Sequence, residues 1–124
     1  PSGLPASVGA LATADDDTVY ASTSDGLHRS TDRARSWKRM GSELVFAVAA
    51  GGDSVFASKA QGVGIRVSED GGKSWTDAGE GLGPAPIVAL ATSEDGKTVV
   101  AADQAAGIWR SVDGGKAWTR VPTP

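Results

Sequence analysis

Cysteine is absent from this chain of 124 residues, so disulfide bonds and thiolate metal sites are excluded. Basic residues are not in excess: the formal net charge is -3, which disfavours a nucleic-acid partner. No apolar run approaches the roughly 20 residues of a membrane-spanning helix, and no basic start followed by an apolar stretch marks a signal peptide. Aromatic residues make up only 6% of the chain, and histidine occurs once. We therefore expect neither a nucleic-acid partner nor membrane insertion.

Glycine and tryptophan, by contrast, are prominent in the sequence. The 17 glycines indicate many turns, as in an all-β fold with short strands. Trp37, Trp75 and Trp118 recur 38 and then 43 positions apart. Each ends a stretch of similar sequence, which runs over residues 26–37, 64–75 and 107–118. A tandem repeat near 40 residues with strand-like content has the length of a β-propeller blade.

Each repeat predicts four strands. The first is small and apolar, and we place it next to the propeller axis, where strands crowd together. The second is β-branched and aromatic, which suits a pleated surface packed on its neighbours. The third runs through Leu27, Ile65 or Ile108, and the fourth begins at the recurring tryptophan. We expect an all-β fold of three four-stranded antiparallel meanders, at about residues 8–40, 43–78 and 86–121.

The turn between the third and fourth strands reads Ser-x-Asp-Gly-Gly-Lys-[Ser/Ala]-Trp in the second and third repeats. We expect its aspartate to accept hydrogen bonds from backbone N–H groups of its own turn. Its second glycine can take a positive φ, and its tryptophan can pack between sheets with the indole N–H on a carbonyl. A calcium site built from Asp70 and Asp113 is weaker, because the loop lacks alternating oxygen ligands. We therefore assign a structural role, and no metal or cofactor, to Ser30, Asp32, Trp37, Ser68, Asp70, Gly72, Trp75, Ser111, Asp113, Gly115 and Trp118.

The first repeat departs from this pattern, because Arg33, Ala34 and Arg35 replace Gly-Gly-Lys. Ala34 stands where glycine would take a positive φ. That conformation costs an alanine roughly 1 kcal/mol, so either the turn is kept under strain or it is reshaped.

The motif resembles the Asp-box, or BNR, repeat. Its sequence is similar to that of blades of sortilin-type (Vps10) propellers, family 74 xyloglucanases and photosystem II stability factors, and to that of sialidases in the turn alone. The resemblance implies a propeller fold and slightly favours an extracytoplasmic or secreted location. It does not imply one function, because these families share turns and differ in their sites.

Catalysis is not favoured by the residues present. The resemblance to sialidases would require an arginine triad and a tyrosine nucleophile, but Tyr20 repeats the position of Phe56 and Val100, which predicts a core residue. Family 74 enzymes place two carboxylates in a cleft between two full propellers, which 124 residues cannot form. No spacing singles out an acid–base pair among the carboxylates of the connecting loops. His28 aligns with Arg66 and Trp109, which favours a sheet-face residue over a catalytic base.

Binding is best placed on the loops that vary between repeats, although the same loops can be plain connectors. We expect a non-catalytic binding or assembly module for a protein or a glycan, on the loop face or in the axial channel. Trp109 either fills the space between blades or forms a stacking platform. The alternatives are a glycosidase-like enzyme or a fragment of one, and a half-propeller with a purely structural or self-assembly role. The candidate binding residues are Asp25, Glu43, Lys59, Gln61, Glu80, Asp103 and Gln104.

Three blades leave two open sheet faces, whereas closed propellers typically have 4–8 blades. Each end would expose an apolar face suited to a neighbouring blade. The sequence after Trp118 leads to the segment before Val8 much as the sequence after Trp75 leads to Val88. We therefore expect a homodimer that forms one six-bladed propeller, with a fragment that lacks its remaining blades as the rival explanation.

Overall fold

The computed structural model describes residues 8–14, 17–23, 26–41, 45–59, 64–79, 81–82 and 85–122. Within these ranges, twelve strands form three four-stranded sheets. The first sheet contains β1 (Val8–Thr13), β2 (Val19–Thr23), β3 (Gly26–Ser30) and β4 (Lys38–Gly41). The second contains β5 (Val45–Gly51), β6 (Ser54–Lys59), β7 (Ile65–Ser68) and β8 (Thr76–Asp77). The third contains β9 (Ile87–Thr92), β10 (Val99–Asp103), β11 (Ile108–Ser111) and β12 (Thr119–Val121).

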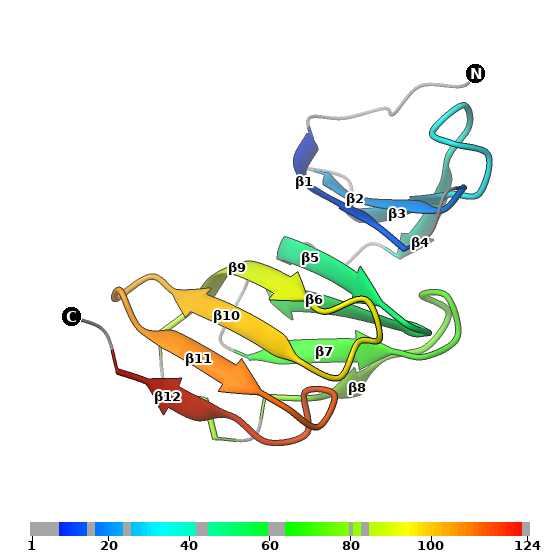
Figure 1. Cartoon of the computed structure of the whole chain (residues 1–124). Helices are drawn as coiled ribbons and strands as arrows, with labels where there is room; N and C mark the ends of the chain where they lie inside the picture. The colour runs from blue at the N-terminus through cyan, green and yellow to red at the C-terminus, as the bar shows by residue number, and fades with distance from the viewer. Residues whose placement is uncertain are drawn as a thin grey trace.

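Each sheet is an antiparallel meander in which consecutive strands are neighbours. Figure 1 shows the sheets arranged one after another, with β5 beside β9 and facing the first sheet. The first strands adjoin, because β5 contacts both β1 and β9. The all-β fold and the three four-stranded blades predicted from the sequence are confirmed. In the part of the chain that is described, no helix is long and apolar enough to span a membrane.

The strands pair in the same register in all three blades. Val19, Val55 and Val99 each lie opposite the serine that opens the following turn. Because side chains alternate between the two faces of a strand, this shared register places equivalent residues on the same face of every blade.

Apolar side chains pack between the sheets. Tyr20 and Leu27 of the first blade meet Val48 and Val55 of the second, with Trp75 packed against them. A second cluster joins the next two blades: Phe56, Ile65, Ile87, Val99, Ala101 and Trp118. Each blade is therefore stabilised mainly by burial against its neighbour, as in other repeat proteins.

The inner hairpin turns hold the second and third blades together at the axis. The Gly52 N–H donates to the Glu94 carbonyl at 2.6 Å, and the Thr92 hydroxyl donates to the Ala50 carbonyl at 2.9 Å. Gly52 has a φ of 57°, and a Cβ there would lie 2.6 Å from the Asp95 carbonyl oxygen. Glycine is required at this position because the two backbones approach so closely.

Candidate functional site

The turns between the third and fourth strands are held by one serine and one aspartate each, and we call them the serine–aspartate turns (residues 30–37, 68–75 and 111–118). In the second blade the Ser68 hydroxyl donates to Asp70 at 2.7 Å and accepts the Gly72 N–H at 2.8 Å. Asp70 in turn accepts the N–H groups of Lys73 and Ser74 at 3.0 and 2.9 Å. The predicted aspartate-to-backbone bonds are confirmed, and the buried serine adds an equally central acceptor.

The third blade repeats this geometry. Ser111 donates to Asp113 at 2.7 Å and accepts the Gly115 N–H at 2.9 Å. Gly72 and Gly115 have φ values of 93° and 87°, so the predicted positive φ is confirmed at both.

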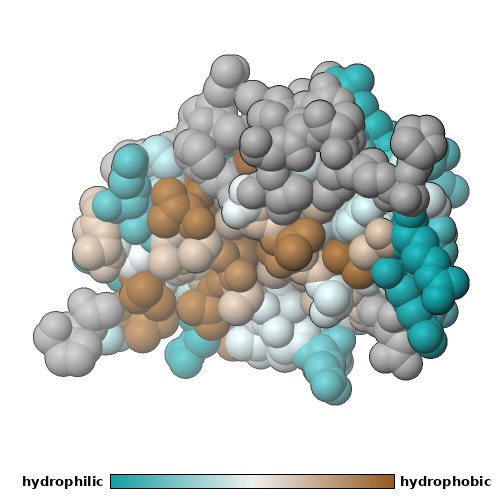
Figure 2. Space-filling view, turned by 90° about the horizontal axis from the view of Figure 1, so that it is seen from above, coloured by the Kyte–Doolittle hydropathy of each residue, from teal (hydrophilic) through white to brown (hydrophobic). Residues whose placement is uncertain are grey.

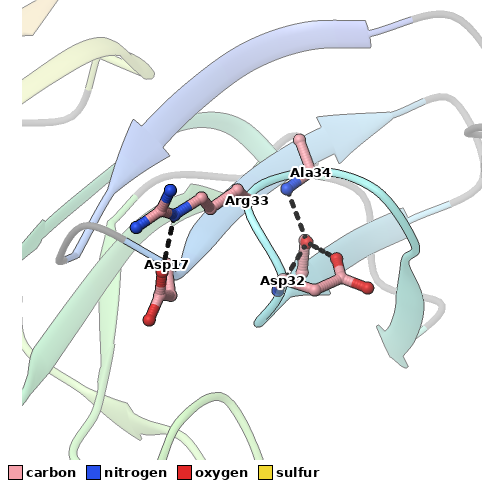
Figure 3. A network of polar contacts seen from close by, with 5 residues as sticks. Asp17, Asp32, Arg33 and Ala34 are labelled. Atoms are coloured by element: carbon pink, nitrogen blue, oxygen red, sulfur yellow. Dashed lines mark hydrogen bonds and ion pairs between the residues drawn. The ribbon is translucent and has the colours of Figure 1, made fainter.

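The first turn keeps the same conformation in spite of its different sequence. Arg33 and Ala34 have φ values of 63° and 69°, in the left-handed region that favours glycine. The Ala34 N–H donates to the Ser30 hydroxyl at 2.9 Å, and Ser30 donates to Asp32 at 2.8 Å. Figure 3 shows Asp32 and Ala34 on this turn. The Arg33 side chain turns aside to an exposed ion pair with Asp17 at 2.9 Å. Of the two outcomes the sequence allows, the strained turn is the one adopted.

The aspartates of these turns are strong acceptors, and their pKa values fall accordingly. Hydrogen bonds from the side chain and backbone of Ser36 lower the pKa of Asp32 to about 2. The hydroxyl and N–H of Ser74 lower the pKa of Asp70 well below its usual range. The Ser111 hydroxyl does the same for Asp113. Hydrogen bonds to a carboxylate stabilise its charged form, so these groups stay ionised at neutral pH.

Two of the tryptophans that close these turns, Trp75 and Trp118, lie between blades. Trp118 is buried, and its indole N–H donates to the carbonyls of Ala78 in the second blade, at 2.6 Å, and of Gly115, at 3.0 Å. Trp75 is half-buried and donates to the Gly72 carbonyl at 3.1 Å. The predicted packing of these indoles is confirmed.

The forward face of a blade is the face on the side of the following blade, and in the first two blades that neighbour covers it. In the second blade this face carries Phe56 and Ile65, which are 0% and 1% exposed. The register places Val100 and Ile108 at the same positions of the third blade. Val100 is 38% exposed and Ile108 is half-buried, because the third blade has no successor among the described residues. The forward face of the third blade is thus an apolar surface without its usual cover.

The opposite, backward face packs on the preceding blade. Val48 lies on the backward face of the second blade and is 5% exposed, whereas Leu11 at the equivalent position of the first blade is 62% exposed. Trp37 is half-buried on this face. Ala21 and His28, also on this face, are buried, so its exposed part lies at Leu11 and beside the turn. Seen from above in Figure 2, hydrophobic residues form a band flanked by hydrophilic ones.

The first strands of the three blades line an open hollow of about 710 Å³. Most of its lining residues are small or apolar, and Thr13, Thr92 and Ser93 add hydroxyl groups to its polar backbone surface. Among the described residues of this lining, Glu94 carries the single charged side chain. Within their sheets, β1, β5 and β9 each pair with one neighbour, so each has a second backbone edge at the inner side.

Three of the candidate binding residues lie in the described structure, and the side chains of two of these, Lys59 and Asp103, have partners within the chain. Lys59 pairs with Asp77 at 3.4 Å. Asp103 accepts the N–H groups of Ala105 and Gly107 at 2.9 and 2.7 Å, and its pKa is lowered chiefly by the indole N–H of Trp109. Gln104 is exposed on the same loop. Asp25, Glu43, Gln61 and Glu80 lie outside the described residues, so the predicted site stays a prediction.

The other residues singled out by the sequence have structural positions. Tyr20 is 3% exposed in the cluster between the first two blades, which confirms a core residue. His28 is buried on the sheet, with Nδ1 3.4 Å from the Thr23 hydroxyl. Trp109 packs against the cluster between the second and third blades and donates to Asp103 at 2.9 Å, so it fills interblade space. Across the described ranges, no group of three His, Asp or Glu side chains is placed to hold a metal ion.

Sequence reasoning missed one contact between blades. Arg29 of the first blade donates from Nη1 to the Gly71 carbonyl, in the serine–aspartate turn of the second blade, at 2.7 Å. The repeat pattern suggested only an arginine stem along a sheet. The one signal was that Arg110 occupies the equivalent position in the third blade.

Neither a protein-family model nor a curated protein matches this chain. Among solved structures, YCF48 bound to a D1 peptide matches with a TM-score of 0.78 at 17% identity, over 95% of this chain and 42% of that one. YCF48 from Cyanidioschyzon merolae matches with a TM-score of 0.77 at 16% identity, over 96% of this chain and 38% of that one. An ancestral GH74 enzyme matches with a TM-score of 0.72 at 19% identity, over 94% of this chain and 18% of that one.

The chain spans less than half the length of each of these proteins. At such identities the likeness concerns the fold, and it agrees with the resemblance to family 74 blades read from the sequence. The protein is a run of three propeller blades that match part of the fold of YCF48 and of a GH74 enzyme.

Proposed function

We propose that this chain is a non-catalytic propeller module that closes into a six-bladed ring with a second copy, and that the ring binds an extended protein segment. The observation that carries the proposal is the pair of end faces. The forward face of the third blade and the backward face of the first have the residue positions that are buried at the two junctions within the chain. In a ring of two copies related by a two-fold axis, the forward face of each third blade is covered by the backward face of the partner's first blade.

The carboxylates support a binding role over catalysis. A general acid needs a pKa raised toward neutrality, as in glycosidases. Here hydrogen bonds lower the pKa values of Asp32, Asp70, Asp95, Asp103 and Asp113, and each of these groups serves its own turn or loop. None of these five carboxylates has the environment of a catalytic acid.

The hollow at the axis supports a protein ligand over a glycan. Its small side chains leave room beside the inner edges of β1, β5 and β9, and an extended peptide can pair with such an edge through its main chain. A glycan site would gain from an exposed aromatic platform, but Trp109 is packed into the interblade cluster. YCF48, which has the same fold, has been solved with a peptide of D1. Glu94 at the hollow favours a segment with a basic residue.

A paired array experiment tests this proposal. The chain is applied to an array of extended basic and acidic peptides and to a glycan array, and is incubated separately with chromogenic glycosides. We expect binding to basic peptides and no glycoside turnover. Glu94→Lys should abolish the preference for basic peptides, whereas Glu69→Lys, which reverses another exposed charge outside the hollow, should leave it unchanged. Glycoside turnover, or binding to glycans alone, would contradict the proposal.

A further inference from the structure

We infer that Val100 and Arg110 of the third blade are matched to the first serine–aspartate turn of a second copy, so that the two ends of the chain select each other. This inference rests on the proposed ring and adds which side chains meet at its junction. It follows from two contacts within the chain, one at each junction between blades, and each has a counterpart at the ends.

The first contact is the hydrogen bond between neighbouring blades. Arg29 donates to the Gly71 carbonyl in the turn of the following blade at 2.7 Å. Arg110 has the same register position in the third blade and is exposed. The blade that would follow is the first blade of the second copy, where Arg33 takes the place of Gly71.

The backbone of that turn is suited to accept the bond. Arg33 and Gly71 hold the same position in their turns and have similar φ values of 63° and 77°. The Arg33 guanidinium is drawn to Asp17 of its own hairpin, as Figure 3 shows, and this keeps the like charge away from an incoming Arg110. A Cβ at Gly71 would overlap Nη1 of Arg29. The Cβ of Arg33 of the partner subunit therefore requires the flexible end of Arg110 to shift as it donates to the carbonyl of that residue.

The second contact is a match of side-chain size. Gly115 packs so tightly on the preceding blade that a Cβ there would lie 2.8 Å from Cε1 of Phe56. At the junction of the second and third blades an aromatic ring thus meets a glycine, whereas at the first junction a Cβ at Gly72 would meet Met40. At the junction of two copies, Val100 takes the position of Phe56, and Ala34 takes the position of Gly115. Valine is smaller than phenylalanine and alanine is larger than glycine, so the two differences offset each other in the packed volume between the blades.

This match gives a reason for the strained alanine. Ala34 holds a φ of 69°, which glycine would adopt without steric cost. Its methyl group fills the space that Val100 leaves relative to an aromatic ring. Position 34 of the first turn and position 100 of the third blade therefore form a complementary pair across the junction.

A double-mutant cycle on the dissociation constant of the dimer tests the size match. The variants are Val100→Phe, Ala34→Gly and the double variant, which recreates the pair found between the second and third blades. We expect Val100→Phe to raise the dissociation constant at least about tenfold, because it overpacks the junction. The double variant should return to within about twofold of wild type. Val112→Phe, at a valine that is 68% exposed in a turn, controls for the added apolar surface and should leave the constant unchanged.

A second pair of variants tests the hydrogen bond. Arg110→Met should weaken the dimer about tenfold while leaving the thermal midpoint of the dissociated chain unchanged. Arg29→Met removes the equivalent bond inside the chain and should do the reverse. Equal effects of both variants on the dimer would overturn the role of Arg110.

The outcomes separate this inference from the ring itself. A wild-type chain that stays monomeric at 100 times the working micromolar concentration would overturn the ring, and the junction with it. A wild-type dimer in which the effects of Val100→Phe and Ala34→Gly simply multiply would leave the ring standing and overturn the junction. Loss of the far-ultraviolet strand signal would identify an unfolded variant, and the hydrogen-bond pair then decides the inference.

Discussion

Trp118→Ala removes the largest side chain buried between the second and third blades, where Trp118 is 4% exposed. A buried tryptophan removes about 150–250 Å² from water, which at about 25 cal/mol per Å² corresponds to roughly 4–6 kcal/mol. Residual burial in the unfolded chain reduces this by about 10–40%, to roughly 3–5 kcal/mol. The substitution also leaves the Ala78 carbonyl without its indole donor.

The assay is urea denaturation followed by far-ultraviolet circular dichroism at one fixed protein concentration, because association shifts the apparent stability. We expect the free energy of unfolding to fall by about 3–5 kcal/mol. Trp118→Phe is the matched control, since it keeps an aromatic ring and loses the N–H donor, and it should cost about 1–2 kcal/mol. A loss below about 1 kcal/mol for the alanine variant would refute the claim that interblade burial stabilises the fold.

Three further changes test the serine–aspartate turns. Ala34→Gly should leave the stability of the dissociated chain unchanged or raise it by up to about 1 kcal/mol, because glycine relieves the φ of 69°. Ala117→Gly, at a residue without a positive φ, should lower the stability. The opposite ranking of the two variants in urea melts would contradict the strain at Ala34. Ser111→Ala should lower the free energy of unfolding by about 1–3 kcal/mol, because the buried hydroxyl both accepts the Gly115 N–H and donates to Asp113. A thermal midpoint equal to that of the wild type would argue against these hydrogen bonds. Asp32 has a lowered pKa, so its contribution to folding stability is present above about pH 4 and is lost as the pH falls through about 2. Asp32→Asn should therefore flatten the pH dependence of stability over this window. An unchanged pH profile would show that the hydrogen bonds to Asp32 do not stabilise the folded state.

The blades and their turns could be predicted because they are encoded locally and three times over. The spacing of Ser68, Asp70 and Gly72 already requires a turn in which backbone N–H groups point inward, and the structure has that turn in every blade. The strained turn at Ala34 could not be settled from the sequence. Its local preference opposes a positive φ, and only the hydrogen bonds to Ser30 and Asp32 decide in favour of it.

The candidate site was harder to predict for a different reason. Asp103 looked like a free loop carboxylate, but its partners are set by how its loop folds back onto Trp109. Arg29 reaches a carbonyl 42 residues away, and no local pattern reports such a distance. Which residues stand on the forward face of the third blade depends on the register of β10 and β11.

The most direct test of the central claim is the mass of the wild-type chain in solution, measured by light scattering during gel filtration at micromolar concentration. The account predicts one symmetric species with twice the chain mass of 12.5 kDa, which dissociates reversibly on dilution. A folded species at the single-chain mass across the whole concentration range would contradict it, because the end faces would then be stable in water. A polydisperse series of larger species would contradict it equally, because the two ends would then fail to close on each other.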